Sequence, residues 1–527
     1  IGVKTAAELI NKYGTLEKLL KSADEIKQNK RRETLIENKD KALISKQLVT
    51  LMKDAPTNRE LSEFKLKDID KDKLYAFLRE MEFNRLLSSV ISAYGEPELS
   101  GSIDEKKIKE KQQAISKKNY HLITNLDQID EWIKEAEEVG EVAVDTETSS
   151  LDAHQADLIG VSLSSKIGKA CYIPIGHKSS KCLKKDDVIK KLKPLLEDPS
   201  VKKIGQNIKF DFIVLYKHGI TISSMEDTML MSYVLDAGKN RHNMDTLSEI
   251  HLGHKTISFK EIVGTGKKEI NFSEVEVDKA KDYAAEDADI TFRLYKKFIK
   301  NLKLEKMVNI YEIFEKPLIK ILAFMEMEGI EVDSKFLKSL SLKFEKKIKN
   351  LEKEVFKISK KEFNIASPKQ LGEIIYNDLK IAGLKKTKKG SFATSASVLE
   401  DLAFKGHKFP QLILDWRQVS KLKNTYSDSL PEHINPTTKR VHTSFLLAAT
   451  TTGRLASSDP NLQNIPIKSE DGKDIRKAFS AKKDHLLISA DYNQIEMRIL
   501  ADLADVKELK KAFKNNEDIH SLTASQI

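Results

Sequence analysis

The chain has 527 residues, which is too many for one hydrophobic core and, at ~100–200 residues per domain, indicates three or four domains. Its 40% hydrophobic and 32% charged residues exclude an intrinsically disordered protein, and we find neither an apolar run of ~18 residues nor a secretory signal. The formal net charge of +10 favours a polyanionic partner such as nucleic acid.

The chain contains two cysteines, Cys171 and Cys182. So few cysteines in a long chain indicate a reducing compartment, and we expect a cytoplasmic protein. Cys171 lies in the strand-like run KACYIPI, so we predict that it is a small core residue rather than a reactive thiol.

The N-terminal sequence IGVKTAAELINKYGTLEKLL contains two short helical patterns on either side of a glycine turn, which predicts a helix-hairpin-helix. Gly2 and Lys4, at the start of the first helix, would present backbone N–H groups to a phosphate. An ordinary capped helix pair is the alternative. Further along, residues 101–120 contain six lysines and three acids with few apolar residues, which indicates a linker or a solvated surface.

Between about residues 120 and 300, strand-like runs alternate with helical patterns. The predicted strands include EVAVDT, LIGVSLS and KACYIPI, and the predicted helices include DVIKKLKPLLED, TMLMSYVLD and KAKDYAAEDADITFRLYKKFI. This alternation predicts an α/β domain with a mixed sheet. Asp227, directly before TMLMSYVL, is predicted to be a helix N-cap.

The last third of the chain begins with a predicted long helix. Apolar residues recur every three or four positions between residues 334 and 363, and the lysines of this amphipathic helix would face solvent or a phosphate backbone. From about residue 440, a glycine-containing polar loop precedes a predicted strand, HLLISAD, and a predicted helix, QIEMRILADLA.

Four carboxylates have surroundings that indicate a metal site. Asp145 and Glu147 lie two residues apart on one face of a predicted strand, where their charges repel each other unless a cation offsets them. Asp211 lies in the apolar run GQNIKFDFIVL, and Asp287 follows Tyr283 by four residues on one helix face. Oxygen ligands favour Mg²⁺ or Mn²⁺, and two such ions suit phosphodiester hydrolysis, with Tyr283 orienting the water.

The segments DTET, GQNIKFD and YAAEDAD resemble the three motifs of the DEDD-type 3′→5′ exonucleases that have a tyrosine in the third motif. The resemblance implies an RNase H-like domain that binds two Mg²⁺ ions, with Mn²⁺ as a substitute. It implies that the metal ligands are Asp145, Glu147, Asp211 and Asp287, and that Tyr283 positions the attacking water. It also implies DNA contacts by Leu151, Gln206, Asn207 and Arg241.

Two later segments, TTGRLASSDPNLQNIP and DYNQIEMRIL, closely resemble blocks of the family A DNA polymerases. By this resemblance the first block contacts the minor groove of a primer–template, where acceptors common to all base pairs report pairing geometry. Its contact residues would be Arg454, Asn461, Gln463 and Asn464. Asp491 and the carbonyl of Tyr492 would bind magnesium. Gln494, Glu496 and His520 would contact the incoming nucleotide, with Glu496 excluding a ribose 2′-hydroxyl.

The N-terminal segment is similar to the helix-hairpin-helix of the 5′-nuclease domain in bacterial members of that family. We therefore expect a multidomain α/β and α+β chain, with the end of a 5′-nuclease domain at 1–92 and a linker at 93–119. An exonuclease domain would follow at 120–302, and the N-terminal part of a polymerase domain at 303–527. The last part would contain a helical thumb at about 334–440 and a partial palm at about 441–527.

The resemblance implies a monomeric enzyme of DNA replication and repair that binds DNA and, in the full-length protein, deoxynucleoside triphosphates. The acidic site of the 5′-nuclease would precede Ile1. The nucleotide-gripping helix and second carboxylate of the polymerase would follow Ile527. We therefore expect a complete proofreading site and half of a polymerase site.

Two alternatives are a stand-alone RNA-trimming nuclease of the DEDD type and a binding module without catalysis. The block DYNQIEMRIL argues against the first, and the presence of all four carboxylates argues against the second.

Overall fold

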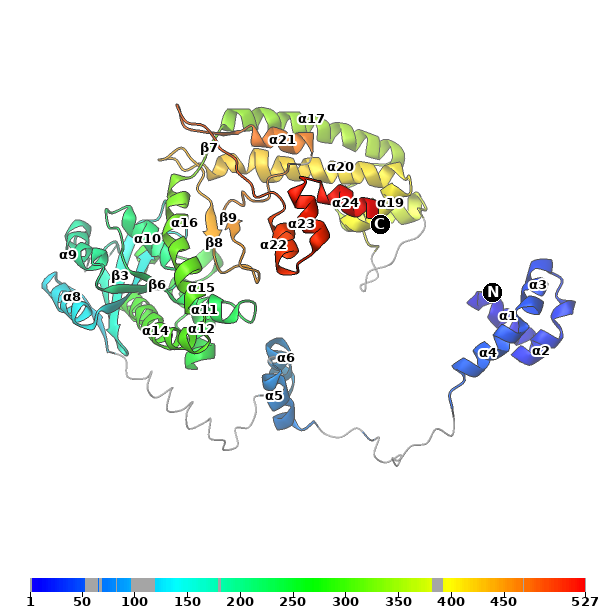
Figure 1. Cartoon of the computed structure of the whole chain (residues 1–527), viewed down its shortest axis with the longest axis horizontal. Coiled ribbons are helices and arrows are strands. Elements are labelled where there is room, and N and C mark those ends of the chain that lie inside the picture. The colour runs from blue at the N-terminus through cyan, green and yellow to red at the C-terminus, as the bar shows by residue number, and fades with distance from the viewer. Residues whose placement is uncertain are drawn as a thin grey trace. The chain divides into compact units, whose positions relative to one another are not determined.

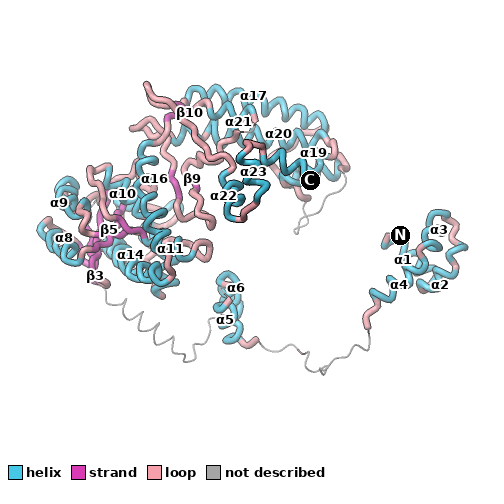
Figure 2. The backbone as a smooth tube through the Cα atoms, viewed as in Figure 1, coloured by secondary structure: helices cyan, strands magenta, loops and turns pink. Residues whose placement is uncertain are grey.

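The computed structural model describes residues 2–52, 65, 69–81, 83–95, 119–178, 182–381, 392–467 and 469–526. The chain divides into two compact units, residues 1–102 and 103–527. Figure 1 shows the helices and strands along the chain, and Figure 2 shows that, among the described residues, strands occur only in the second unit. Most of the predicted linker, residues 96–118, lies outside the described residues.

The first unit is built from short helices: α1 (Val3–Tyr13), α2 (Leu16–Lys21), η1 (Ala23–Glu25), α3 (Asn29–Glu37), α4 (Lys39–Val49), α5 (Lys71–Glu80) and α6 (Asn84–Tyr94). Gly14 turns the chain between α1 and α2 with a φ of +84°, a conformation that glycine adopts without strain. Thr15 then caps α2 by accepting a hydrogen bond from the Lys18 amide at 3.3 Å. The predicted pair of helices around a glycine turn is confirmed.

The second unit is organised around a six-stranded sheet with the order β1-β4-β3-β2-β5-β6. The strands are β1 (Asn119–Leu122), β2 (Glu141–Thr148), β3 (Leu158–Lys166), β4 (Lys169–Pro174), β5 (Lys202–Gly205) and β6 (Met225–Asp227). β2 pairs with β3 in antiparallel and with β5 in parallel orientation, so the predicted mixed sheet is confirmed. Cys171 on β4 is fully buried in the core, as expected.

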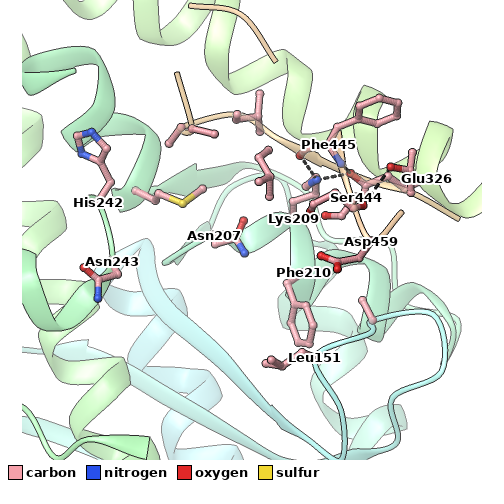
Figure 3. A pocket seen from close by; sticks show the side chains of 18 of the residues that line it. Leu151, Asn207, Lys209, Phe210, His242, Asn243, Glu326, Ser444, Phe445 and Asp459 are labelled. Atoms are coloured by element: carbon pink, nitrogen blue, oxygen red, sulfur yellow. Dashed lines mark hydrogen bonds and ion pairs between the residues drawn. The ribbon is translucent and has the colours of Figure 1, made fainter. Parts of the chain in front are cut away.

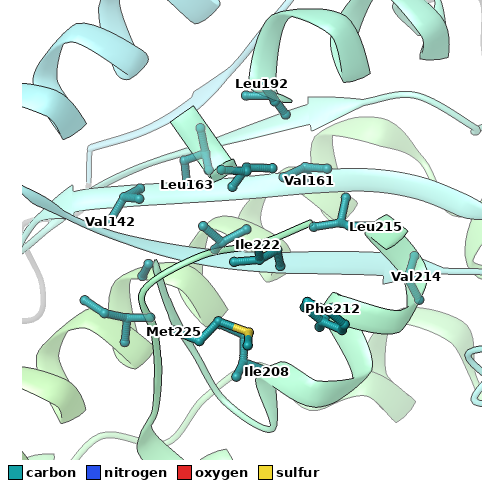
Figure 4. Close-up of a cluster of buried hydrophobic side chains, with 14 of the residues drawn as sticks. Val142, Val161, Leu163, Leu192, Ile208, Phe212, Val214, Leu215, Ile222 and Met225 are labelled. Carbon is teal, nitrogen blue, oxygen red and sulfur yellow. The ribbon is translucent and has the colours of Figure 1, made fainter. Parts of the chain in front are cut away.

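Helices cover this sheet: α8 (Asp127–Val139), α9 (Lys185–Glu197), α10 (Ile208–Tyr216), α11 (Thr228–Asp236), α12 (Met244–Leu252), α13 (Phe259–Val263) and α14 (Val277–Leu304). The 3-10 turns η3 (Gly266–Lys268) and η4 (Phe272–Glu274) precede α14. Figure 4 shows core side chains from both layers, including Val161 of β3, Leu192 of α9 and Phe212 of α10. Burying each such side chain contributes roughly 1.5–3 kcal/mol.

Asp227 holds the start of two helices. Its carboxylate accepts from the amides of Asn207 and Ile208 at 3.1 and 3.0 Å, and from that of Met229 at 2.8 Å. The predicted N-cap of α11 is therefore confirmed, and the same side chain also fixes the start of α10.

A mostly helical region follows the sheet. Its helices are α15 (Val308–Ile310), η5 (Tyr311–Glu315), α16 (Lys316–Glu328), α17 (Ser334–Ser359), α18 (Pro368–Glu373), η6 (Ile374–Asp378), α19 (Ala396–Phe404), α20 (Lys408–Leu422), η7 (Lys423–Asp428), η8 (Leu430–His433), α21 (Glu470–Arg476), α22 (Ile495–Leu503), α23 (Lys507–Lys514) and α24 (Ile519–Gln526). Its short strands are β7 (Glu331–Val332), β8 (Ser444–Leu446), β9 (Ala456–Ser458) and β10 (Phe479–Ser480). The predicted long amphipathic helix is α17, which buries Leu337, Leu340 and Phe344.

The segment HLLISAD, residues 485–491, is not a strand, so that prediction is wrong. Leu486, Leu487 and Ile488 are 89, 58 and 91% exposed. A strand requires a hydrogen-bonded neighbour, and this segment has no strand partner among the described residues. The helix predicted directly after it is confirmed as α22. In the described part of the chain, no helix is long and apolar enough to span a membrane.

Candidate active site

Three of the predicted metal ligands converge where α14 packs on β2, a strand in the interior of the sheet. Asp145 and Glu147 lie on β2, the strand between β3 and β5, and Asp287 lies on α14, which packs across β2, β3 and β4. One carboxylate oxygen from each residue lies within 4.8 Å of the other two. The register between β2 and β3 shifts at Glu147 and Thr148, an irregularity that changes the direction of side chains next to the cluster.

Burial raises the pKa values of these three carboxyl groups, and repulsion adds to the effect at two of them. Burial raises the pKa of Asp145 to about 6. Burial and then the charge of Asp145 raise the pKa values of both Glu147 and Asp287 well above their usual range. Oε1 of Glu147 is buried and has no hydrogen-bond partner among the described residues. A divalent cation among these oxygens would satisfy the orphaned atom and offset the repulsion, so the residues present fit a metal.

Asp211 lies beside this cluster but is oriented differently. One of its carboxylate oxygens accepts from the amide of Thr146 at 2.9 Å and from the hydroxyl of the same residue at 2.6 Å. Burial and the charge of Asp145 raise the pKa of Asp211, against the effect of the two hydrogen bonds. The helix α10 therefore brings Asp211 to β2, next to Asp145 and Glu147, where Thr146 fixes its orientation.

Tyr283 lies one turn before Asp287 on α14 and is enclosed by aromatic rings. The centroids of Phe259 and Phe272 lie 6.1 and 6.0 Å from that of Tyr283. Burial and then the charge of Asp287 raise the pKa of the Tyr283 hydroxyl, so the phenol stays protonated and can donate a hydrogen bond. This is the state required to orient a water molecule.

Two adjoining cavities border the site. One, of about 780 Å³, is lined by Asp145, Glu147, Tyr283 and Asp287, and the other, of about 890 Å³, is lined by Asn207 and Arg241. Leu151 and Phe210 line both cavities, and Leu151 is 94% exposed. Figure 3 shows these two residues at the larger cavity. The predicted contact residues Asn207 and Arg241 therefore line a cavity that shares Leu151 and Phe210 with the cavity of the acidic cluster.

Unlike Asn207, Gln206 has a side-chain amide that hydrogen-bonds to other parts of the protein through both its nitrogen and its oxygen. It donates to the carbonyl of His242 at 2.7 Å and accepts from the hydroxyl of Thr228 at 2.6 Å. Gln206 does not line either cavity.

Sequence reasoning missed several residues of the site: Thr146, Phe210, Phe259, Asn271 and Phe272. Thr146 and Phe210 lie inside the two motifs that were singled out, so their positions alone marked them as candidates. Phe259 begins α13, Phe272 begins η4 and Asn271 lies directly before η4. No local pattern indicates that this part of the chain lies next to the acids.

Most of the described residues predicted for DNA synthesis lie on the surface. Asp491 and Tyr492 are exposed in an irregular segment, and Gln494 precedes α22 with a φ of +52°. Arg454 and Glu496 are brought together, with a nitrogen–oxygen distance of 2.9 Å. Both side chains are exposed, so this pair contributes at most about 1 kcal/mol.

The remaining predicted contacts are held by local bonds or are not described. Oδ1 of Asn461 accepts from the amide of Gln463 at 3.0 Å, and the carbonyl of Asn464 accepts from the Tyr426 hydroxyl. Gly2 is the N-cap residue of α1 and, because glycine has no side chain, it makes no side-chain capping bond. The side chains of Lys4 and His520 lie outside the described part of the structure.

Three family models match the chain. Residues 334–527 match DNA polymerase family A, residues 120–303 match a 3′-5′ exonuclease, and residues 1–72 match a 5′-3′ exonuclease, C-terminal SAM fold. The three matches follow one another along the sequence in the order 5′-3′ exonuclease, 3′-5′ exonuclease and polymerase.

Curated relatives are similar over all of this chain. DNA polymerase I of Rhizobium leguminosarum is 42% identical over 606 residues, and DNA polymerase I of Pseudomonas aeruginosa is 39% identical over 541 residues. Each alignment covers 100% of this chain but only 60 and 58% of the relative. The chain thus spans about three fifths of the length of these relatives.

A solved structure is also similar. It is the POL domain of Pol1 from M. smegmatis in complex with DNA primer-template and dNTP. The TM-score is 0.66 at 29% sequence identity, and the match covers 77% of this chain and 66% of that one.

Proposed function

The chain belongs to the bacterial DNA polymerase I family, and from this premise we propose that it shortens DNA from the 3′ end by metal-dependent hydrolysis. The observation that carries the proposal is the convergence of Asp145, Glu147 and Asp287, with a buried and unpartnered oxygen on Glu147. The match of residues 120–303 to a 3′-5′ exonuclease supports it.

Asp145, Glu147, Asp211 and Asp287 would hold two Mg²⁺ ions, or Mn²⁺ in their place. When bound, such ions activate a water molecule and stabilise the leaving oxyanion. The protonated hydroxyl of Tyr283 donates a hydrogen bond that orients the water. Glu147 and Asp287 are buried, so electrostatic interactions at their carboxylates are stronger than in bulk water.

The single strand would lie in the two adjoining cavities. Leu151 and Phe210, which line both cavities, would contact the terminal bases through apolar faces. Asn207 and Arg241 line the larger cavity, where Arg241 would bind a phosphate. Because every base has an apolar face that Leu151 and Phe210 can contact, digestion would be largely independent of sequence.

In the whole protein we further propose template-directed DNA synthesis in replication and repair, with the nuclease as proofreader. The match of residues 334–527 to DNA polymerase family A supports this over a stand-alone exoribonuclease. The partners would be a primer–template and deoxynucleoside triphosphates, and the whole protein would be a cytoplasmic monomer. Asp491, Tyr492 and the residues of the TTGRLASSDPNLQNIP block stay predicted contacts for these partners.

The test is digestion of 5′-labelled oligonucleotides, resolved on a denaturing gel. With Mg²⁺ the chain should shorten single-stranded DNA from its 3′ end and leave RNA of the same sequence largely intact. An Asp145→Ala variant is the control for a contaminating nuclease. Preferential loss of the RNA would favour the exoribonuclease, and no digestion of either strand would favour a binding module.

A further inference from the structure

The helix α10, which carries Asp211, is held from two opposite sides. Residues two apart on a helix point in nearly opposite directions, so Asp211 and Lys209 face different neighbours. Asp211 accepts two hydrogen bonds from Thr146 of β2. Lys209, which is 5% exposed, points away from the sheet toward a segment that lies more than 100 residues later in the chain.

Two elements after the sheet, α16 and β8, provide the partners of Lys209. Its ammonium donates to Oε1 of Glu326 on α16 and to the carbonyl of Phe445 on β8, the latter at 2.5 Å. The amide of Phe445 donates to the same oxygen of Glu326 at 2.6 Å. Figure 3 shows the three residues joined in this way at the wall of the larger cavity. Glu326 is 3% exposed, so both charged partners are buried, while Phe445 is partly buried.

The helix α16 is part of the same core as the sheet. Ile319, Leu322 and Ala323 are buried in the cluster that contains Phe212 of α10. Phe324 of α16 meets Phe212 edge to face, with ring centroids 5.7 Å apart. Yet α16 and β8 both lie outside residues 120–303, the part of the chain that matches a 3′-5′ exonuclease.

A buried ion pair is a poor source of stability, because the cost of removing two charges from water roughly cancels their attraction. Its hydrogen bonds are directional, however, and here they fix the position of the helix that carries Asp211. We propose that Glu326 is a positioning residue of the nuclease site, acting through Lys209 on α10 and thus on Asp211. The inference rests on the proposed metal-dependent nuclease. It assigns part of that site to α16, which lies outside residues 120–303.

Direct measurement of Mn²⁺ binding by titration calorimetry tests this without relying on activity. Glu326→Gln and Lys209→Met should each weaken Mn²⁺ binding by ~10-fold, the lower end of the effect of residues that orient ligands. The two substitutions change the local charge in opposite directions, so a purely electrostatic effect would shift the affinity in opposite directions. The double variant should bind no more weakly than either single one, because the pair acts as a unit.

Lys203→Met is the matched control. Lys203 is fully buried in the same sheet region, but it donates to the carbonyls of Asp198 and Val201 and to the hydroxyl of Ser223. Its loss should lower the melting temperature and leave Mn²⁺ affinity unchanged. In digestion assays, Glu326→Gln should lower kcat ~10-fold and leave KM for single-stranded DNA within about twofold.

The possible failures are distinct. If the wild-type chain binds Mn²⁺ but digests nothing, the proposed nuclease fails while the positioning role can still be measured. If Glu326→Gln and Lys209→Met lower the melting temperature but bind Mn²⁺ like the wild type, the pair is only structural and the inference is overturned. Opposite shifts in affinity would also overturn it, in favour of a long-range charge effect.

Discussion

Thr146 donates both its amide and its hydroxyl to one carboxylate oxygen of Asp211, at 2.9 and 2.6 Å. Thr146 lies on β2 between Asp145 and Glu147, so the strand that carries two acids of the cluster also orients Asp211 beside it. The side chain of Thr146 points to the sheet face opposite its two neighbours, toward α10. The strand β2 therefore carries Asp145 and Glu147 on one face and contacts Asp211 from the other.

Thr146→Val should destabilise the protein, because it leaves the buried Asp211 with one donor fewer. The loss of a hydrogen bond to a buried acid costs about 1–3 kcal/mol. The free energy of unfolding from urea titration in EDTA measures the effect. Thr146→Ser, which keeps the hydroxyl, is the control and should lie within about 1 kcal/mol of the wild type. Equal stability of the valine and serine variants would contradict the importance of this bond.

The metal-free protein should become less stable as the pH rises from about 4 to 6, relative to Asp145→Asn. Burial raises the pKa of Asp145 from 3.8 to about 6, so the folded state binds its proton more tightly than the unfolded state does. The resulting stabilisation is complete below pH 3.8 and is lost as the pH passes 6. Urea denaturation of both proteins in EDTA gives the difference curve.

Mg²⁺ should reverse that loss, because it binds the ionised carboxylates of the folded state. The same denaturation series repeated with Mg²⁺ should therefore show higher stability at pH 7 in the wild type than in Asp145→Asn. A flat difference curve in EDTA would contradict the raised pKa of Asp145, and no response to Mg²⁺ would contradict metal binding by these acids.

Asp211→Ala should lower the nuclease rate at least ~100-fold, because it removes one of the groups that would stabilise charge in the transition state. Binding of single-stranded DNA should change little, since Asp211 does not line either cavity. Single-turnover digestion and fluorescence anisotropy measure the two quantities. Asp186→Ala, which removes an exposed acid of α9, is the control. A near wild-type rate for Asp211→Ala would exclude this residue from the site.

Affinity for single-stranded DNA should fall linearly with salt on logarithmic axes, because cationic side chains release counterions from phosphates. Arg241→Ala should reduce the magnitude of that slope by ~0.7, the contribution of one phosphate contact on a single strand. Lys190→Ala removes an exposed charge of α9 outside both cavities and should leave the slope unchanged. Anisotropy titrations from low to physiological salt decide this, and equal slopes in both variants would place the strand elsewhere.

Local sequence determined much of the proposed nuclease site. Asp145 and Glu147 share a strand face and Tyr283 and Asp287 share a helix face, because the periods of 2 and 3.6 relate nearby residues directly to directions in space. Asp227 was recognisable as the N-cap of α11 for the same reason, since the Met229 amide that it accepts from lies two residues later. These features depend only on neighbours within about one helical turn.

The tertiary structure alone decided what depends on distant partners. HLLISAD has the pattern of a strand but lacks a paired neighbour among the described residues, so its pattern could not become a strand. The side-chain amide of Gln206 has the donor and acceptor that a DNA contact needs. In the folded protein the donor bonds the carbonyl of His242 and the acceptor bonds the hydroxyl of Thr228. The bond between Lys209 and Glu326 joins residues 117 positions apart, and nothing in either local sequence specifies the other. Local periodicity sets the direction of a side chain, whereas its partner is set by how the helices and strands pack.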